Sequence, residues 1–207
     1  YHDRCMEGVS VLLSDYPMPL AETASIFNET LLMEKMLETA DDATKLTLIE
    51  QQVGDAAQVV VDILSRYLFE SEVVDRRKER SLSPRELCEI MLDAQKQTYG
   101  DGLDPDCMHP YMWACKSHYY DTDVHFYNFP YAFGLLFGLG VFVQFQKEGA
   151  AFVPKYDKLL ASCGSDTVRN VAASVGIDVN SVDYWRSALD VVRGEINEFL
   201  ALSEKKC

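Results

Sequence analysis

The 207-residue sequence lacks the short motifs that identify several large enzyme classes. It contains no HExxH motif of zinc proteases, no GxSxG motif of serine hydrolases, and neither of the glycine-rich loops that bind nucleotides. Its four histidines are not spaced as a self-contained metal site. Taken by itself, the chain is therefore either an incomplete enzyme or a helical protein that binds a partner.

The sequence also lacks cysteine pairs and an excess of positive charge. Its six cysteines are scattered without a CxxC pair, which argues against a disulfide framework and against a structural zinc site. We expect reduced thiols, as in cytoplasmic proteins. The 33 acidic residues outnumber the 19 basic ones and give a net charge of −14, so we expect no nucleic acid among the partners.

Long hydrophobic runs are scarce as well. The longest apolar stretch, residues 131–145, is interrupted by three glycines and is shorter than the roughly 20 residues that span a bilayer. The opening Tyr1-His2-Asp3-Arg4 lacks the basic start and apolar core of a secretory signal. With 48% hydrophobic residues, the chain is expected to be a cytoplasmic globular protein without membrane contact.

What the sequence does contain is apolar residues at helical spacing. Ser83-Pro84-Arg85-Glu86 has the N-cap, the proline at the first helical position and the glutamate of a capping box. Residues 101–124 form the longest irregular stretch, and no repeat or linker divides the chain. We therefore expect an all-α fold and a single α-helical domain over residues 1–207. The predicted helices cover residues 20–38, 41–69, 84–98, 131–149, 156–162, 166–175 and 181–203.

Two carboxylates form the first candidate site. Glu22 and Glu29 are seven residues apart, close to two helical turns, so they project from nearly the same face of the predicted helix over residues 20–38. The apolar neighbours of the pair predict a largely buried helix, where ionised carboxylates need a partner. The two acids either cap or pair with neighbouring groups, or they bind a cation directly or through a histidine that they orient.

A loop rich in histidine and tyrosine forms the second candidate site. It contains the segment Trp113–Tyr120 and leads through His125 into the glycine-containing helix at residues 131–149. Imidazole and phenol groups donate hydrogen bonds to a developing oxyanion in many active sites. Tyrosine-rich loops are also ordinary packing and ligand-contact surfaces, and the residues alone leave both interpretations open.

Both segments resemble oligoendopeptidase F and its thimet-type relatives. The segment from Ala21 to Glu29, AETASIFNE, is similar to the stretch that follows the HExxH helix in that family. The segments from Trp113 to Tyr120 and from Phe126 to Gly134 are similar to the family's histidine- and tyrosine-bearing loop. Shorter matches continue to Trp185. The resemblance implies the helical catalytic domain of a zincin-type peptidase.

The resemblance also implies roles for individual residues. Glu22 would be a zinc ligand, and Glu29 would support a ligating histidine. His118 with Tyr127 or Tyr131 would contact the substrate backbone and stabilise the tetrahedral intermediate. His125 competes with His118 for this role, and His118 is favoured because Trp113-Ala114 precedes it. The remaining substrate contacts are expected from Tyr120 and His125.

The family's HExxH histidines and general-base glutamate are expected immediately before Tyr1. The chain is therefore expected to be a C-terminal fragment whose partner is the missing N-terminal part of the same protein. The intact protein would be a zinc-dependent endopeptidase that cleaves short oligopeptides, and the fragment alone would be inactive because one carboxylate does not hold a catalytic zinc. The alternative is a non-enzymatic, acidic, helical protein-interaction domain. A carboxylate-bridged four-helix metal protein is disfavoured, because the paired Glu-x-x-His motifs are missing.

Overall fold

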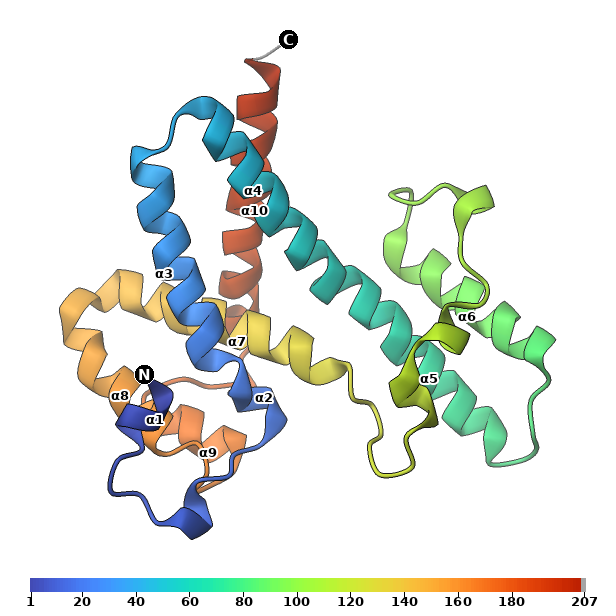
Figure 1. Cartoon of the computed structure of the whole chain (residues 1–207), viewed down its shortest axis with the longest axis horizontal. Helices are drawn as coiled ribbons and strands as arrows, with labels where there is room; N and C mark the ends of the chain where they lie inside the picture. Colours follow the sequence, from blue (N-terminus) through green and yellow to red (C-terminus); the bar gives the residue numbers. More distant parts are fainter. Residues whose placement is uncertain (206–207) are drawn as a thin grey trace. The chain divides into compact units, whose positions relative to one another are not determined.

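The structure is a computed structural model that describes residues 1–205, and this part of the chain contains helices and no strand (Figure 1). The prediction of an all-α fold is confirmed. Contacts between residues group the chain into two compact units, which are described separately below. Unit 1 comprises Tyr1–Ala56 and the chain from Phe133 onward, and unit 2 comprises Ala57–Ala132. The prediction of a single domain stays a prediction.

Unit 1 contains most of the long helices. The short N-terminal helix α1 lies against α8, where His2 Nε2 is 3.1 Å from the carbonyl oxygen of Leu160 (Figure 1). The α-helices that lie wholly or mainly in this unit are α1 (His2–Cys5), α2 (Met18–Ala21), α3 (Thr23–Thr39), α4 (Asp42–Ala57), α7 (Phe129–Glu148), α8 (Val153–Ala161), α9 (Val168–Ala173) and α10 (Val182–Glu204). The last residue of α4 and the first four residues of α7 belong to unit 2. Short 3-10 turns lie at Val11–Leu13 and Gly149–Phe152.

The core of unit 1 is apolar and centres on α7. Phe137 and Val141 of α7 are fully buried, and they belong to one cluster with Leu20 of α2, Phe27 of α3 and Leu160 of α8. Burial of large apolar side chains of this kind is the main favourable contribution to folding. The core therefore fixes α2, α3 and α8 around one central helix.

Glycines let the backbones in this core approach closely. A Cβ atom built on Gly134 would lie 2.8 Å from Cβ of Glu22, and one built on Gly138 would lie 2.7 Å from Cγ2 of Ile26. At Gly140 the side chain of Tyr184 fills the space, and its hydroxyl donates to the carbonyl oxygen of Phe137 at 2.9 Å. The glycines in α7 thus pack against α3 and α10, and they do not interrupt the helix.

The prediction that the apolar stretch around residues 131–145 is interrupted by its glycines and too short to cross a membrane is wrong. Residues Phe129–Ala161 are helical, long enough and apolar enough to do so by length and composition, because the glycines leave α7 continuous. The most apolar window of this stretch is 44% buried inside the structure. The absence of membrane contact stays a prediction.

Unit 2 is built around the helix pair α5 (Ile63–Arg77) and α6 (Pro84–Tyr99). A π-helical turn, Gln58–Asp62, joins α4 to α5. Three 3-10 turns follow α6, at Pro105–Cys107, Met112–Cys115 and Ser117–Tyr120. The small core contains Phe69, Ile90, Met91 and Ala94, and Met112, Trp113 and Tyr119 from the turns pack against it.

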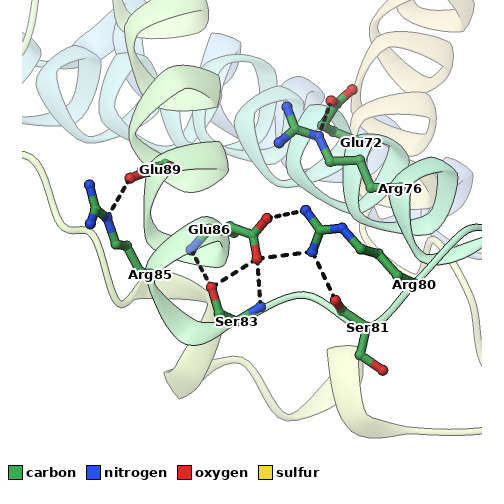
Figure 2. A network of polar contacts seen from close by, with 8 residues as sticks. All are labelled: Glu72, Arg76, Arg80, Ser81, Ser83, Arg85, Glu86 and Glu89. Atoms are coloured by element: carbon green, nitrogen blue, oxygen red, sulfur yellow. Dashed lines mark hydrogen bonds and ion pairs between the residues drawn. The ribbon is translucent and has the colours of Figure 1, made fainter.

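The connection between α5 and α6 is held by polar contacts (Figure 2). The hydroxyl of Ser83 accepts from the backbone N–H of Glu86, and the carboxylate of Glu86 accepts from the backbone N–H of Ser83 at 2.9 Å. Both guanidinium ends of Arg80 donate to the same carboxylate. These bonds lower the pKa of Glu86 to about 2, with the Arg80 bond the largest cause. The predicted capping box is confirmed.

The helix predictions differ from the structure at two joints. The predicted helix over residues 20–38 is divided at Glu22, which ends α2 and precedes α3. The predicted helix over residues 41–69 contains the π-helical turn that ends at Asp62. Both joints lie beside residues that matter for the candidate site.

Candidate functional site

Glu22 occupies the joint between α2 and α3 in unit 1. Its backbone carbonyl accepts from the N–H of Ile26 at 3.0 Å, as in the first turn of a helix. Its half-buried carboxylate accepts a hydrogen bond from the hydroxyl of Ser25 at 2.8 Å. The close approach of Gly134 leaves no room beside the Cβ of Glu22. Packing against Gly134 therefore restricts the base of this side chain, and Ser25 bonds to its carboxylate.

Glu29 lies on α3 and is exposed. The prediction of a largely buried helix is wrong, because only Thr23 and Phe27 of α3 are buried, whereas Leu32 and Met36 are exposed. Within unit 1, α3 turns a single face towards the core. The argument that burial forces Glu29 to have a partner therefore loses its basis, and the role of this residue depends on the family resemblance.

His118 lies in the 3-10 turn Ser117–Tyr120 of unit 2 and is half-buried. Its neighbour Tyr119 packs against the core ring of Phe69 at 5.2 Å between ring centroids, which anchors the turn. The ring of His118 stacks on that of Tyr127, with centroids 5.8 Å apart and planes at 28°. Two residues that are nine positions apart in sequence are thereby brought together.

The surroundings of His118 disfavour its charged form. Burial is the largest cause of the lowered pKa of His118, and the positive charge of Arg66 adds to it. Lys116 acts in the same direction, whereas the carboxylate of Glu70 opposes the change. The imidazole is therefore neutral at pH 7, with one nitrogen that donates a hydrogen bond and one that accepts.

The two other candidate tyrosines differ in their contacts. Tyr131, in the first turn of α7, lies edge-on to Tyr127 with centroids 5.8 Å apart, so His118, Tyr127 and Tyr131 form a row of rings. Tyr120 is exposed, and its hydroxyl donates to the carbonyl oxygen of Trp113 at 3.3 Å. His125 is exposed. Among the described residues it forms no hydrogen bond or ring contact with His118, Tyr120, Tyr127 or Tyr131.

A buried polar network lies beneath this row of rings, and the sequence analysis missed it. The guanidinium of Arg66 donates to the carboxylate of Asp62 and, at 3.4 Å, to Oδ1 of Asn128. Nδ2 of Asn128 lies 2.8 Å from Nε2 of His118. Tyr99 donates to the second oxygen of Asp62 at 2.9 Å. The available signal was the i, i+4 spacing of Asp62 and Arg66 on an otherwise apolar helix.

The segment that follows His118 turns sharply before α7. Phe126 has a φ of +53°, a conformation that is rare for bulky residues. Its backbone N–H donates to the carboxylate of Glu70 at 2.8 Å, and its ring lies 5.5 Å from that of Tyr67. Contacts with α5 therefore compensate the strained backbone and deliver Tyr127 and Asn128 to His118.

A cavity of about 400 Å³ lies elsewhere in unit 2, between α5 and α6. Its lining is mainly polar and acidic, and none of the candidate site residues belongs to it. The lining residues are Leu68, Ser71, Glu72, Asp75, Arg76, Glu89, Ile90, Asp93, Ala94 and Gln97.

The donor groups of the described chain fit only part of a zinc site. Among residues 1–205 no group of three His, Cys, Asp or Glu side chains is placed to hold a metal ion. Glu22 is half-buried and its carboxylate is bonded to Ser25, and a carboxylate is suited to be one of the three protein ligands of a catalytic zinc. The described cysteines are free thiols, and Cys207 lies outside the described residues.

Comparison with known proteins gives a consistent match. The sequence profile of "Peptidase family M3" matches residues 7–191. Oligopeptidase PepF of Bacillus subtilis is 25% identical over 193 residues, which are 92% of this chain and 28% of that protein. An oligoendopeptidase F homolog of Lactococcus lactis is 26% identical over 201 residues, 96% of this chain and 33% of that protein.

A solved structure shows the same fold. The crystal structure of oligoendopeptidase-F from Enterococcus faecium superposes with a TM-score of 0.81 at 21% identity, and the match covers 99% of this chain and 38% of that one. The resemblance to oligoendopeptidase F that the sequence motifs indicated is thereby confirmed. The chain spans about a third of the length of the relatives it matches.

Proposed function

The chain belongs to peptidase family M3, and on that premise we propose that it is the C-terminal part of the catalytic domain of a cytoplasmic, zinc-dependent endopeptidase that hydrolyses short oligopeptides. The names of the two sequence relatives, an oligopeptidase and an oligoendopeptidase homolog, support this substrate class. Because the chain covers about a third of such proteins, the activity is proposed for the intact enzyme. The 207 residues alone are expected to be inactive.

Glu22 is the proposed zinc ligand of this chain. The packing of its Cβ against Gly134 and the bond from Ser25 to its carboxylate support the assignment, and the other ligands are expected from the part of the enzyme outside these residues. When bound, zinc supplies an activated water and polarises the substrate carbonyl. Glu29 is proposed to support a ligating histidine. Because Glu29 is exposed on α3, a histidine from outside these residues can reach it.

His118, Tyr127 and Tyr131 are the proposed catalytic residues. A neutral imidazole and two phenols each carry one hydrogen-bond donor, and donors held in place before the reaction stabilise the oxyanion of a tetrahedral intermediate. His118 is preferred over His125 because its ring stacks on Tyr127 and bonds to Asn128. Exposed Tyr120 and His125 are proposed to contact the substrate.

The observation that carries the proposal is the row of rings His118–Tyr127–Tyr131 within the family match. Neighbouring rings in this row are 5.8 Å apart, and all three residues fall between residues 7 and 191. His118 and Tyr127 are half-buried and Tyr131 is exposed, so the row is not part of a fully buried core.

The first test measures zinc content and cleavage of a quenched oligopeptide by the intact enzyme, wild type beside Glu22→Gln. The variant is expected to lose both zinc and cleavage. The matched control is Glu38→Gln. Glu38 is an exposed acid on α3 that forms an ion pair with Lys35, and this variant should retain both zinc and cleavage. Glu29→Gln is expected to fall between the two, with a loss of about 10–100-fold.

Two outcomes would contradict the proposal. Unchanged zinc and cleavage in Glu22→Gln would remove Glu22 as a ligand. An intact wild-type enzyme that binds no zinc and cleaves no peptide would favour the alternative of a helical interaction domain.

A further inference from the structure

The buried network beneath His118 has no role in the proposed function so far. Asp62, Arg66 and Asn128 are 7%, 8% and 2% exposed, and all three lie in unit 2. Burying an ion pair is costly unless its geometry is good and its remaining groups are bonded. Such a costly pair lies next to a candidate catalytic histidine, and Asn128 connects the two.

The order of donors and acceptors in this network is fixed by Arg66. A guanidinium group only donates hydrogen bonds, so the atom of Asn128 that faces it must be the acceptor Oδ1. The amide nitrogen Nδ2 of Asn128 is then the atom that faces His118, at 2.8 Å from Nε2. The reverse orientation of the amide would set its N–H groups against those of Arg66.

The orientation of Asn128 in turn fixes the proton on His118. Nδ2 of Asn128 only donates, so Nε2 of His118 must accept and must be unprotonated. The proton of the neutral ring is therefore on Nδ1. Within residues 1–205 the side-chain hydrogen bond of His118 uses Nε2, which leaves the Nδ1–H for a ligand.

Asp62 keeps Arg66 in the required place. Its carboxylate accepts from Arg66 and from the hydroxyl of Tyr99, and it lies in the π-helical turn one helical turn before Arg66. Single π-helical turns inside α-helices are frequent at functional sites. Here the turn precedes the helix that carries Arg66.

We propose that Asn128, oriented by Arg66, is a positioning residue that holds His118 as the Nδ1–H tautomer, so that Nδ1 is the donor which His118 offers to the peptide substrate. The last clause rests on the proposed function, whereas the tautomer itself does not. Asn128 touches neither substrate nor metal in this assignment and acts only through His118.

The direct test is the nitrogen NMR spectrum of the histidines in the intact, ¹⁵N-histidine-labelled enzyme, with His118→Gln to assign the signal. The expected wild-type pattern is a protonated Nδ1 and an unprotonated Nε2. Asn128→Asp replaces the amide by an isosteric group that only accepts, so the pattern should reverse to a protonated Nε2. Asn197→Asp, the same change at an exposed position on α10, should leave the pattern unchanged.

The second test is kinetic. Asn128→Asp keeps a bond to Arg66 and a bond to His118, so a merely structural role would be satisfied by it. The positioning role instead predicts a fall in kcat on the order of 10²-fold, with KM within about twofold. The limb of the pH profile due to His118 should also move to higher pH, since a carboxylate joins Glu70 and opposes Arg66 and Lys116 around the ring.

The outcomes separate the two proposals. A protonated Nε2 in the wild-type enzyme, or a kcat of Asn128→Asp equal to that of Asn197→Asp, would overturn the positioning role while leaving the peptidase proposal intact. A protonated Nδ1 in an enzyme that cleaves no peptide would confirm the tautomer and overturn the peptidase proposal.

Discussion

The two units hold their proposed active-site groups by different physical means. In unit 1, the carboxylate of Glu22 accepts one local hydrogen bond, from Ser25, and Cβ of Glu22 packs closely against Gly134 over an apolar core. In unit 2, His118 is set by a chain of buried polar groups that ends in an ion pair. A proposed metal ligand is thus positioned by close packing, and a proposed proton-bearing group by hydrogen-bond polarity.

The difference follows from what each group has to supply. A carboxylate has two equivalent accepting oxygens, so it needs no partner that selects between them. An imidazole has two chemically distinct nitrogens, and only a partner of fixed polarity selects which of them carries the proton. The predictions below test whether unit 2 depends on buried polarity and unit 1 on backbone packing.

The largest effect is expected for Arg66→Met. The change leaves the carboxylate of Asp62 buried without its cation, which typically costs about 3–5 kcal/mol. Hydrogen–deuterium exchange of the intact protein should show lost protection within residues 57–132. Arg76→Met is the control, because its ion pair with Glu72 is half-exposed and is expected to contribute about 0–1 kcal/mol. Equal effects of the two substitutions would mean that unit 2 does not depend on its buried pair.

An intermediate effect is expected for Gly134→Ala. The added methyl group would lie 2.8 Å from Cβ of Glu22, and such overpacking typically costs about 1–3 kcal/mol. The midpoint temperature of thermal unfolding and the zinc affinity of the intact enzyme should both decrease, since Glu22 must move. Gly194→Ala on α10 meets no atom within 4 Å, and it should raise stability by up to about 1 kcal/mol through helix propensity. Unchanged zinc affinity in Gly134→Ala would break the link between this packing contact and Glu22.

The smallest effect is expected for Ser83→Ala, which removes the N-cap of α6 at a typical cost of about 1 kcal/mol. The same cap should give unit 2 an acid sensitivity. Since the folded pKa of Glu86 is about 2, below its unfolded value, its contribution is complete above the unfolded pKa and is lost as the pH falls towards 2.

Amide exchange in residues 80–99, compared between pH 7 and pH 3, measures this sensitivity. Glu86→Gln should lower the protection at pH 7 and make it less dependent on pH. A pH dependence in Glu86→Gln as steep as in the wild type would show that the cap is not its source.

The sequence predicted those parts of the structure that depend on local patterns. The capping box at Ser83 and the apolar helix around Phe137 follow from short-range rules, and both are present. The motif from Ala21 to Glu29 led to the correct family. The break at Glu22 was not predicted from the local pattern, and Glu22 packs there against Gly134, more than a hundred positions away.

The link from the Asp62–Arg66 pair to Asn128 and His118 was beyond sequence patterns for the same reason. Asn128 and His118 join the pair only in the folded unit. The spacing of Asp62 and Arg66 was visible, but an Asp-x-x-x-Arg pair on a helix usually marks a solvated surface. Here both members are buried. The preference for His118 over His125 came from the family resemblance, through Trp113-Ala114, and the stacking of His118 on Tyr127 adds a structural argument to it.

The hydrogen bond between His118 and Asn128 also closes the loop of residues 119–127 at its base. Within this loop, the backbone N–H of Phe126 is hydrogen-bonded separately to Glu70. The entropy of closing a loop changes slowly with its length, by roughly 0.6 kcal/mol for each doubling. Insertions or deletions among the exposed residues 121–123 should therefore be tolerated without displacing His118. The length of this loop can therefore vary while His118 and Asn128 at its base stay in place.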